Sequence, residues 1–212
     1  MTRDREPFIS LLLYHAFKDP FINPFFYLYL RGKIEGIENI PKSSGFVVAS
    51  NHGSNFDPPL LSAALQRPIA YMAKEELFEV PILKQAIELY GAYPVKRGAV
   101  DRTTIRAALA YLEQGWGVGL FLSGTRTPDG RVLDAKPGAA LIAAKAQVPI
   151  LPVCLWGNHL IEEKGKKLPR STPITIRIGS LIPAPTSTKR GELDRVTEVC
   201  TTSINQLHDL GR

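Results

Sequence analysis

The chain has few of the residues that mark a disulfide framework or a metal centre. Its 212 residues include two cysteines, Cys154 and Cys200, which are far apart and form no C-x-x-C pair. This usage indicates a reducing compartment. Cys154 lies in the apolar run 150–156 and is expected to be a small buried hydrophobic residue. The four histidines lack the spacing of metal ligands, so neither a metal ion nor another cofactor is expected.

Long apolar runs and blocks of charge are also missing. No stretch approaches the about 20 apolar residues that a membrane-spanning helix needs. The arginines near the N-terminus are offset by acidic neighbours, so a cleavable signal is not expected. The 26 Lys and Arg residues exceed the 20 Asp and Glu residues by a net charge of +6, which mildly favours acidic partners. These basic residues form no stripe with aromatic residues, so nucleic acid is not an expected partner.

Aromatic residues are concentrated near the N-terminus. Two apolar segments, Phe8–Phe17 and Phe21–Leu30, hold eight of the chain's 18 aromatic residues and are separated by a short stretch with a proline. Aromatic side chains beside basic residues, here Arg31 and Lys33, suit the headgroup boundary of an anionic membrane. We therefore expect residues 1–32 to form a helical element that rests, peripherally or monotopically, on the cytoplasmic face of a membrane. The alternative is that one or two helices pack these side chains onto the core.

From residue 33 onward, short β-rich runs alternate with helical patterns, and no linker or repeat divides the chain. This alternation predicts an α/β fold with a single domain, 33–212, in which helices flank a mixed, mostly parallel sheet. The β-rich runs are 33–37, 45–49, 69–73, 92–95, 117–122, 150–155 and 174–178. The helices are expected after Asp57, from Asp101 to Gly115, from Pro137 to Ala146 and over 192–210.

Residues suited to proton transfer follow the second β-rich run, in the segment Ser50-Asn-His-Gly-Ser-Asn-Phe-Asp57. His52 has the side chain best suited to act as a base near neutral pH, and a tight turn would bring Asp57 onto its far ring nitrogen. The chain has no G-x-S-x-G motif and no activated nucleophile. This indicates that the base deprotonates a substrate hydroxyl directly. The alternative is that Asp57 caps a helix and His52 is an ordinary loop residue.

Cations and small residues end two further β-rich runs. Arg97, preceded by Lys96, follows one run, and Arg126, preceded by Gly124 and Thr125, follows another. Arginine binds phosphate through a bidentate fork, while glycine and threonine add close backbone approach and a hydroxyl donor. The two arginines are therefore candidates to clamp a phosphate; the alternative is that they are solvated charges at loop tips.

Together these segments resemble the glycerolipid acyltransferases, the family of the bacterial 1-acylglycerol-3-phosphate acyltransferases. The resemblance covers about residues 30–180 and rests on four blocks in the family's order and spacing. The blocks are Asn51-His52…Asp57 for NHxxxxD, Lys74–Arg97 for the second block, Phe121–Thr127 for F-P-E-G-T-R-S, and Val148–Val153 for V-P-I-x-P-V.

The resemblance implies an α/β catalytic domain behind a helical element that rests on the membrane. It implies transfer of a fatty acyl group from acyl-CoA or acyl-carrier protein to a hydroxyl of a lysophospholipid such as 1-acylglycerol-3-phosphate, in phospholipid biosynthesis. Neither a metal nor a cofactor is implied. The implied roles are general base for His52, orientation of that base for Asp57, phosphate binding for Arg97, Gly124, Thr125 and Arg126, and accessory positions for Asn51, Lys96 and Ser123.

One departure from the family pattern lies in the third block. Where the family has Pro-Glu, this chain has Leu122-Ser123, so a carboxylate that could accept hydrogen bonds from a substrate or an arginine is lost. Three interpretations stay open: the reaction tolerates the change, the acceptor is a different lysolipid, or the protein binds lipid without turnover.

Overall fold

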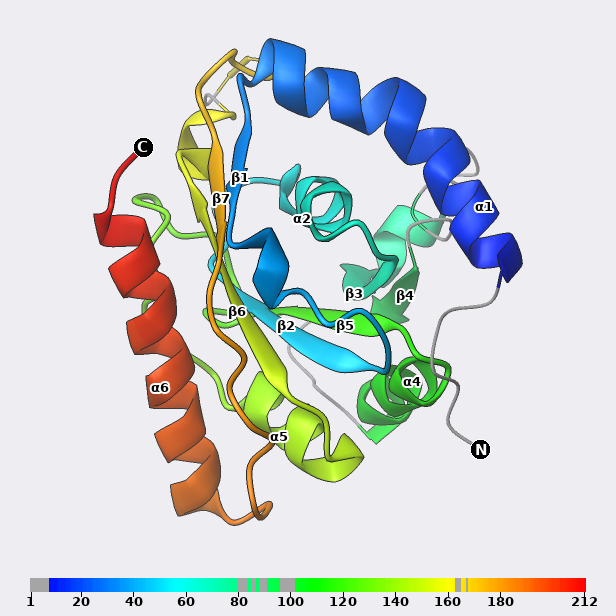
Figure 1. Ribbon diagram of the computed structural model, residues 1–212, viewed down its shortest axis with the longest axis vertical. Helices are drawn as coiled ribbons and strands as arrows, with labels where there is room; N and C mark the ends of the chain where they lie inside the picture. The colour runs from blue at the N-terminus through cyan, green and yellow to red at the C-terminus, as the bar shows by residue number, and fades with distance from the viewer. Residues whose placement is uncertain are drawn as a thin grey trace.

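A seven-stranded sheet forms the centre of the molecule (Figure 1). The computed structural model describes residues 8–79, 84, 87, 91–95, 102–162, 165, 166 and 168–212. The strand order is β1-β7-β6-β2-β5-β3-β4, and every neighbouring pair is parallel except β6 and β7. The strands are β1 (Lys33–Glu35), β2 (Phe46–Ser50), β3 (Ile69–Lys74), β4 (Ala92–Val95), β5 (Gly117–Phe121), β6 (Ile150–Trp156) and β7 (Thr175–Ile178).

Helices cover both faces of this sheet (Figure 1). One face carries α4 (Arg102–Glu113), α5 (Gly138–Ala146) and α6 (Arg190–Asp209), and the other carries α2 (Asp57–Leu65) and the N-terminal helix. The central strands are buried on both faces, which explains why β2 reads as a continuous apolar run rather than an alternating one. The expected α/β class, with a mostly parallel sheet flanked by helices, is confirmed.

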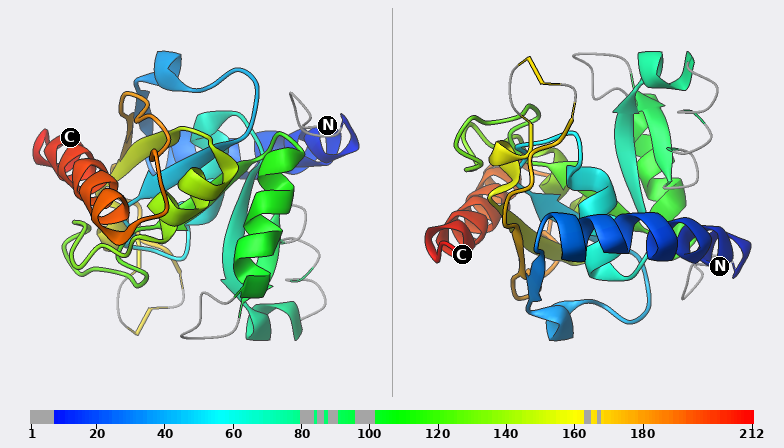
Figure 2. Two further views of the ribbon diagram at one scale, coloured as in Figure 1. Left: turned by 90° about the horizontal axis from the view of Figure 1, so that it is seen from below. Right: turned by 90° about the horizontal axis from the view of Figure 1, so that it is seen from above.

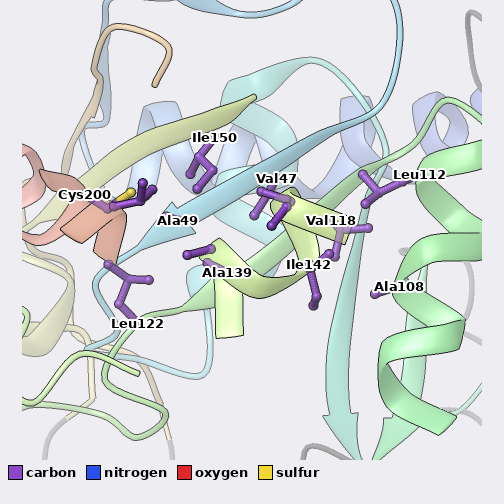
Figure 3. Packing of buried hydrophobic residues seen from close by; sticks show 14 of the residues in the cluster. Val47, Ala49, Ala108, Leu112, Val118, Leu122, Ala139, Ile142, Ile150 and Cys200 are labelled. Atoms are coloured by element: carbon purple, nitrogen blue, oxygen red, sulfur yellow. The ribbon is translucent and has the colours of Figure 1, made fainter. Parts of the chain in front are cut away.

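Two hydrophobic clusters lie on opposite sides of the sheet. Figure 3 shows one of them, in which Val47 and Val118 from the strands meet Ile142 of α5 and Leu112 of α4. Both cysteines belong to this cluster. Burial raises the pKa of each thiol to about 12, as expected for cysteines that serve as small hydrophobic residues.

The N-terminal helix lies across the molecule as one rod (Figure 2). The helix α1 (Phe8–Phe17) continues through two π-helical stretches, Lys18–Ile22 and Phe25–Tyr29. The two apolar segments of the sequence therefore lie on one continuous helical element. Pro20 lacks a backbone donor, but a wider i→i+5 turn, in which the Asn23 N–H bonds to the Lys18 carbonyl, carries the helix past it.

One side of this rod is anchored on the core. Tyr14, Phe26 and Leu30 are almost completely buried, and the Tyr14 hydroxyl donates a hydrogen bond to the Ser62 carbonyl of α2. Several large apolar side chains on the rod stay exposed, among them Phe21 and Leu28. Among the described residues, no helix combines the length and the apolar character needed to cross a bilayer.

Candidate functional site

The candidate site lies at the edge of the sheet where β2, β5 and β6 end. Ser50 of β2 is level with Phe121 of β5 and with Val153 of β6. Because parallel strands end at the same edge of a sheet, the loops that follow them come together there. These loops are 51–56, 122–137 and the segment that begins at 157.

A histidine and a buried carboxylate form the centre of the site. His52 Nδ1 lies 2.8 Å from Asp57 Oδ2. Since a carboxylate only accepts hydrogen bonds, Nδ1 carries the proton and Nε2 presents a lone pair. The imidazole stacks on the Phe121 ring, with the ring centroids 4.0 Å apart, and its side chain is 18% exposed. The ring is thus held at one face and at one nitrogen, and Nε2 is the atom available to take a proton.

The loop between these two residues is folded around the Asp57 carboxylate. Asp57 Oδ2 also accepts hydrogen bonds from the backbone N–H groups of Gly53 at 2.8 Å and Ser54 at 2.9 Å. The N-cap position of α2 belongs to Phe56, so Asp57 is not the helix cap that the alternative interpretation required. Its bonds instead form the tight turn that returns the carboxylate to the imidazole.

Sequence reasoning missed a third member of this group, Asn158. It lies directly after β6, and its Nδ2 donates to both carboxylate oxygens of Asp57 at 3.1 Å. A Cβ atom on Gly53 would lie 2.7 Å from Asn158 Oδ1, so only glycine allows this approach. The one available signal was its position as a polar residue at the carboxyl end of a predicted strand.

Asn51, an accessory candidate, holds the backbone around the site. Its Nδ2 donates to the Gly130 carbonyl at 2.5 Å and to the Leu155 carbonyl at 2.9 Å, and its Oδ1 accepts the Leu155 N–H at 2.8 Å. The side chain is fully buried, and backbone groups use both of its donors. Asn51 therefore ties the end of β2 to β6 and to the loop after β5, rather than facing a substrate.

The phosphate-binding candidates after β5 are exposed beside the histidine loop. Gly124, Thr125 and Arg126 are all exposed, and Gly124 turns the chain with a φ of 66°. The backbone N–H of the next residue, Thr127, donates a hydrogen bond to the His52 carbonyl at 2.9 Å, and its hydroxyl lies between that carbonyl, at 3.2 Å, and the Arg131 carbonyl, at 2.8 Å. The candidate phosphate loop is thereby fastened to the backbone of the candidate base.

Arg126 is paired with a carboxylate that sequence reasoning also missed. Glu162 Oε2 lies 3.2 Å from Arg126 Nη1 and accepts hydrogen bonds from the Ser54 hydroxyl at 2.9 Å and the Asn55 N–H at 2.7 Å. Burial by itself would raise the pKa of Glu162, but the hydrogen bonds from Asn55 and Ser54 and the charge of Arg126 outweigh it and lower that pKa. Glu162 is therefore ionised at neutral pH.

Comparison with known proteins places this arrangement in a family. The family profile described as Acyltransferase matches residues 31–156. A 1-acyl-sn-glycerol-3-phosphate acyltransferase of Bacillus subtilis is 36% identical over 143 residues, which cover 66% of this chain and 71% of that protein. The chain belongs to the acyltransferase family. Chloroplastic 1-acyl-sn-glycerol-3-phosphate acyltransferases of Brassica napus and Arabidopsis thaliana are 33% and 34% identical to it, each over 66% of this chain, which spans only 42% and 40% of their lengths.

A solved structure from the same family has the same fold. The crystal structure of PlsC, the 1-acyl-sn-glycerophosphate acyltransferase of Thermotoga maritima, superposes with a TM-score of 0.75 at 30% identity. The match covers 93% of this chain and 79% of that one. Fold and sequence therefore lead to the same family.

Three further candidate positions are Lys96, Arg97 and Ser123. Lys96 and Arg97 lie outside the described residues. Ser123 is buried, and its Oγ accepts the Leu133 N–H at 3.2 Å, so its hydroxyl is used within its own loop. No group of three His, Cys, Asp or Glu side chains suited to a metal ion occurs in the part of the chain that the structure describes.

Proposed function

We propose that this chain transfers a fatty acyl group from a thioester, either acyl-CoA or acyl-carrier protein, to the free hydroxyl of a lysophospholipid such as 1-acylglycerol-3-phosphate. The observation that carries the proposal is the fixed His52–Asp57 pair, at 2.8 Å, in a chain of the acyltransferase family. The names of its bacterial and chloroplastic relatives, 1-acyl-sn-glycerol-3-phosphate acyltransferases, support the choice of acceptor. Neither cysteine competes as a nucleophile, because both are buried with a strongly raised pKa.

The geometry supports a direct transfer with His52 as general base. His52 Nε2 takes the proton of the acceptor hydroxyl while that oxygen attacks the thioester carbonyl carbon. The carbon–sulfur bond of the resulting tetrahedral intermediate then breaks, and the imidazolium returns the proton to the departing thiolate. The products are an ester and a free thiol. Asp57 stabilises the imidazolium between these two steps, and general-base assistance of this kind is worth about 10²–10⁴-fold in rate.

The exposed loop after β5 is the proposed site for the acceptor phosphate. Arg126 supplies the charge, and Gly124 and Thr125 supply close backbone approach and a hydroxyl. Arg97 and Lys96 are proposed to contribute further positive charge. Because Thr127 holds this loop on the His52 carbonyl, a phosphate bound there would keep its own glycerol hydroxyl near the base.

We further propose that residues 1–32 form an element that contacts an anionic membrane and that 33–212 form the catalytic domain. The N-terminal rod exposes two large apolar side chains, Phe21 at 60% and Leu28 at 80%. The exposed cation Arg31 follows directly. Free buried cysteines fit the reducing cytoplasmic side.

Vesicle flotation tests the proposed membrane contact. Wild-type protein should float with vesicles that contain phosphatidylglycerol, and less with vesicles of pure phosphatidylcholine. The double variant Phe21→Asp, Leu28→Asp should remain in the bottom fraction with both kinds of vesicle. Val199→Asp, at another exposed apolar position, on α6, is the control. Equal flotation of both variants would show that the N-terminal rod is not the element that contacts the membrane.

An acceptor and donor panel tests the proposed reaction. Purified protein is incubated with each of several lysolipids, beginning with lysophosphatidate, and with each acyl donor. Ester formation and thiol release are both measured. Turnover of lysophosphatidate with at least one donor is expected. Turnover of a different lysolipid only would redefine the acceptor, and lipid binding without turnover by any combination would contradict the proposal.

A further inference from the structure

Glu162 connects the loop of the candidate base to the loop of the candidate phosphate arginine. Its Oε2 accepts the Ser54 hydroxyl and the Asn55 N–H, and its Oε1 accepts the Asn55 amide at 2.7 Å. The same Oε2 holds Arg126 Nη1 at 3.2 Å. This one carboxylate thus joins residues that lie 107 and 36 positions away in the chain.

The position of the Glu162 carboxylate is relevant to the glutamate that this chain lacks at position 123. The third block of the family has a glutamate where this chain has Ser123, and Ser123 is buried with its hydroxyl turned to the Leu133 N–H. Ser123 therefore offers Arg126 no negative charge. Glu162 reaches the same loop from the carboxyl end of β6.

The contact leaves Arg126 able to bind a second anion. Only Nη1 is used by Glu162, and the structure gives the guanidinium no other hydrogen bond within the described residues. The side chain is 49% exposed, and a guanidinium has donors on Nε and on both terminal nitrogens. An arginine held at one nitrogen loses less side-chain freedom when a phosphate takes the others.

We infer that Glu162 is the positioning residue for Arg126, and that it supplies from the end of β6 the carboxylate that the third block lacks at Ser123. The inference rests on the proposed function, in which Arg126 binds the acceptor phosphate. Because Glu162 also holds Ser54 and Asn55, it fixes the distance between that phosphate and the His52 loop. Its loss should therefore weaken acceptor binding more than it slows the chemical step.

The test compares Glu162→Gln with wild type on lysophosphatidate and on monoacylglycerol, which lacks the phosphate. Glu162→Gln should raise the KM for lysophosphatidate about tenfold, with kcat changed less than about threefold, and should leave the KM for monoacylglycerol unchanged. In an Arg126→Ala background the same substitution should add little, because the two residues act as one unit. The control Glu192→Gln breaks another Glu–Arg pair, with Arg195 on α6, and should change neither constant.

A relocation variant separates positioning from a merely structural role. The double variant Ser123→Glu, Glu162→Gln returns a carboxylate to the Arg126 loop and should recover most of the lost affinity for lysophosphatidate. An unchanged KM in Glu162→Gln, or an equal rise for both acceptors, would overturn the inference. If the wild type acylates nothing, the proposed reaction fails, and calorimetric binding of lysophosphatidate to wild type and Glu162→Gln decides the role of Glu162 alone: weaker binding by the variant supports it, and equal binding overturns it.

Discussion

Replacing Asn158 with alanine tests how strongly the buried carboxylate of Asp57 depends on a residue 101 positions away. Asp57 Oδ2 has three partners besides Asn158, but the one donor to Oδ1 among the described residues is Asn158 Nδ2 at 3.1 Å. A hydrogen bond to a charged group contributes about 1.5–3 kcal/mol to stability. Asn158 Oδ1 is itself buried and has no hydrogen-bond partner within the described part of the chain, and deleting the amide removes that cost too. We therefore expect the lower part of this range, a loss of about 2 kcal/mol.

Guanidinium unfolding measures this loss, and steady-state acylation measures its effect on the reaction. The control is Asn205→Ala, because Asn205 also makes two hydrogen bonds, to the Val132 backbone, but none to Asp57. Both variants should lose stability, whereas only Asn158→Ala should lose kcat, by about tenfold for each 1.4 kcal/mol of lost transition-state stabilisation. The reasoning is refuted if Asn158→Ala unfolds within about 0.5 kcal/mol of wild type, or if Asn205→Ala lowers kcat equally.

Two further predictions concern buried titratable groups. Burial lowers the pKa of His159 and His208 below 6.5, so the unfolded chain binds their protons first as the pH falls, and the free energy of unfolding should decrease from about pH 7.5 to 5.5. The double variant His159→Gln, His208→Gln should show a flatter profile in urea titrations; equal slopes would contradict this. Because burial raises the pKa of Cys154 and Cys200 to about 12, Ellman's reagent at about pH 8 should react only with unfolded protein, and rapid reaction of the folded protein would be inconsistent.

Local sequence patterns predicted most of the fold, because strands and helices here follow residue periodicity and turn residues closely. All seven β-rich runs correspond to strands, and no strand end differs from its predicted position by more than two residues. The helix after Asp57 and the one that ends at Ala146 were also expected, since prolines fix their starts. A helical element was expected at the N-terminus as well, but the sequence does not show that π-helical turns carry it past its prolines as one rod.

In the site, contacts between residues close in sequence could be predicted, whereas contacts between distant residues could not. The approach of His52 to Asp57 could be predicted, because five residues and one turn decide it. Asn158 and Glu162 could not, because each meets its partner only after β6 has paired with β2. The roles proposed for these residues remain predictions.

The most direct test of the central claim is the rate of lysophosphatidate acylation by His52→Ala, measured beside wild type with saturating acyl donor. If His52 is the general base, the rate should fall by about 10²–10⁴-fold while circular dichroism and the unfolding midpoint stay close to wild type. His15→Ala, which changes an exposed histidine on α1, should keep the wild-type rate. A His52→Ala protein that acylates lysophosphatidate at nearly the wild-type rate would contradict the account.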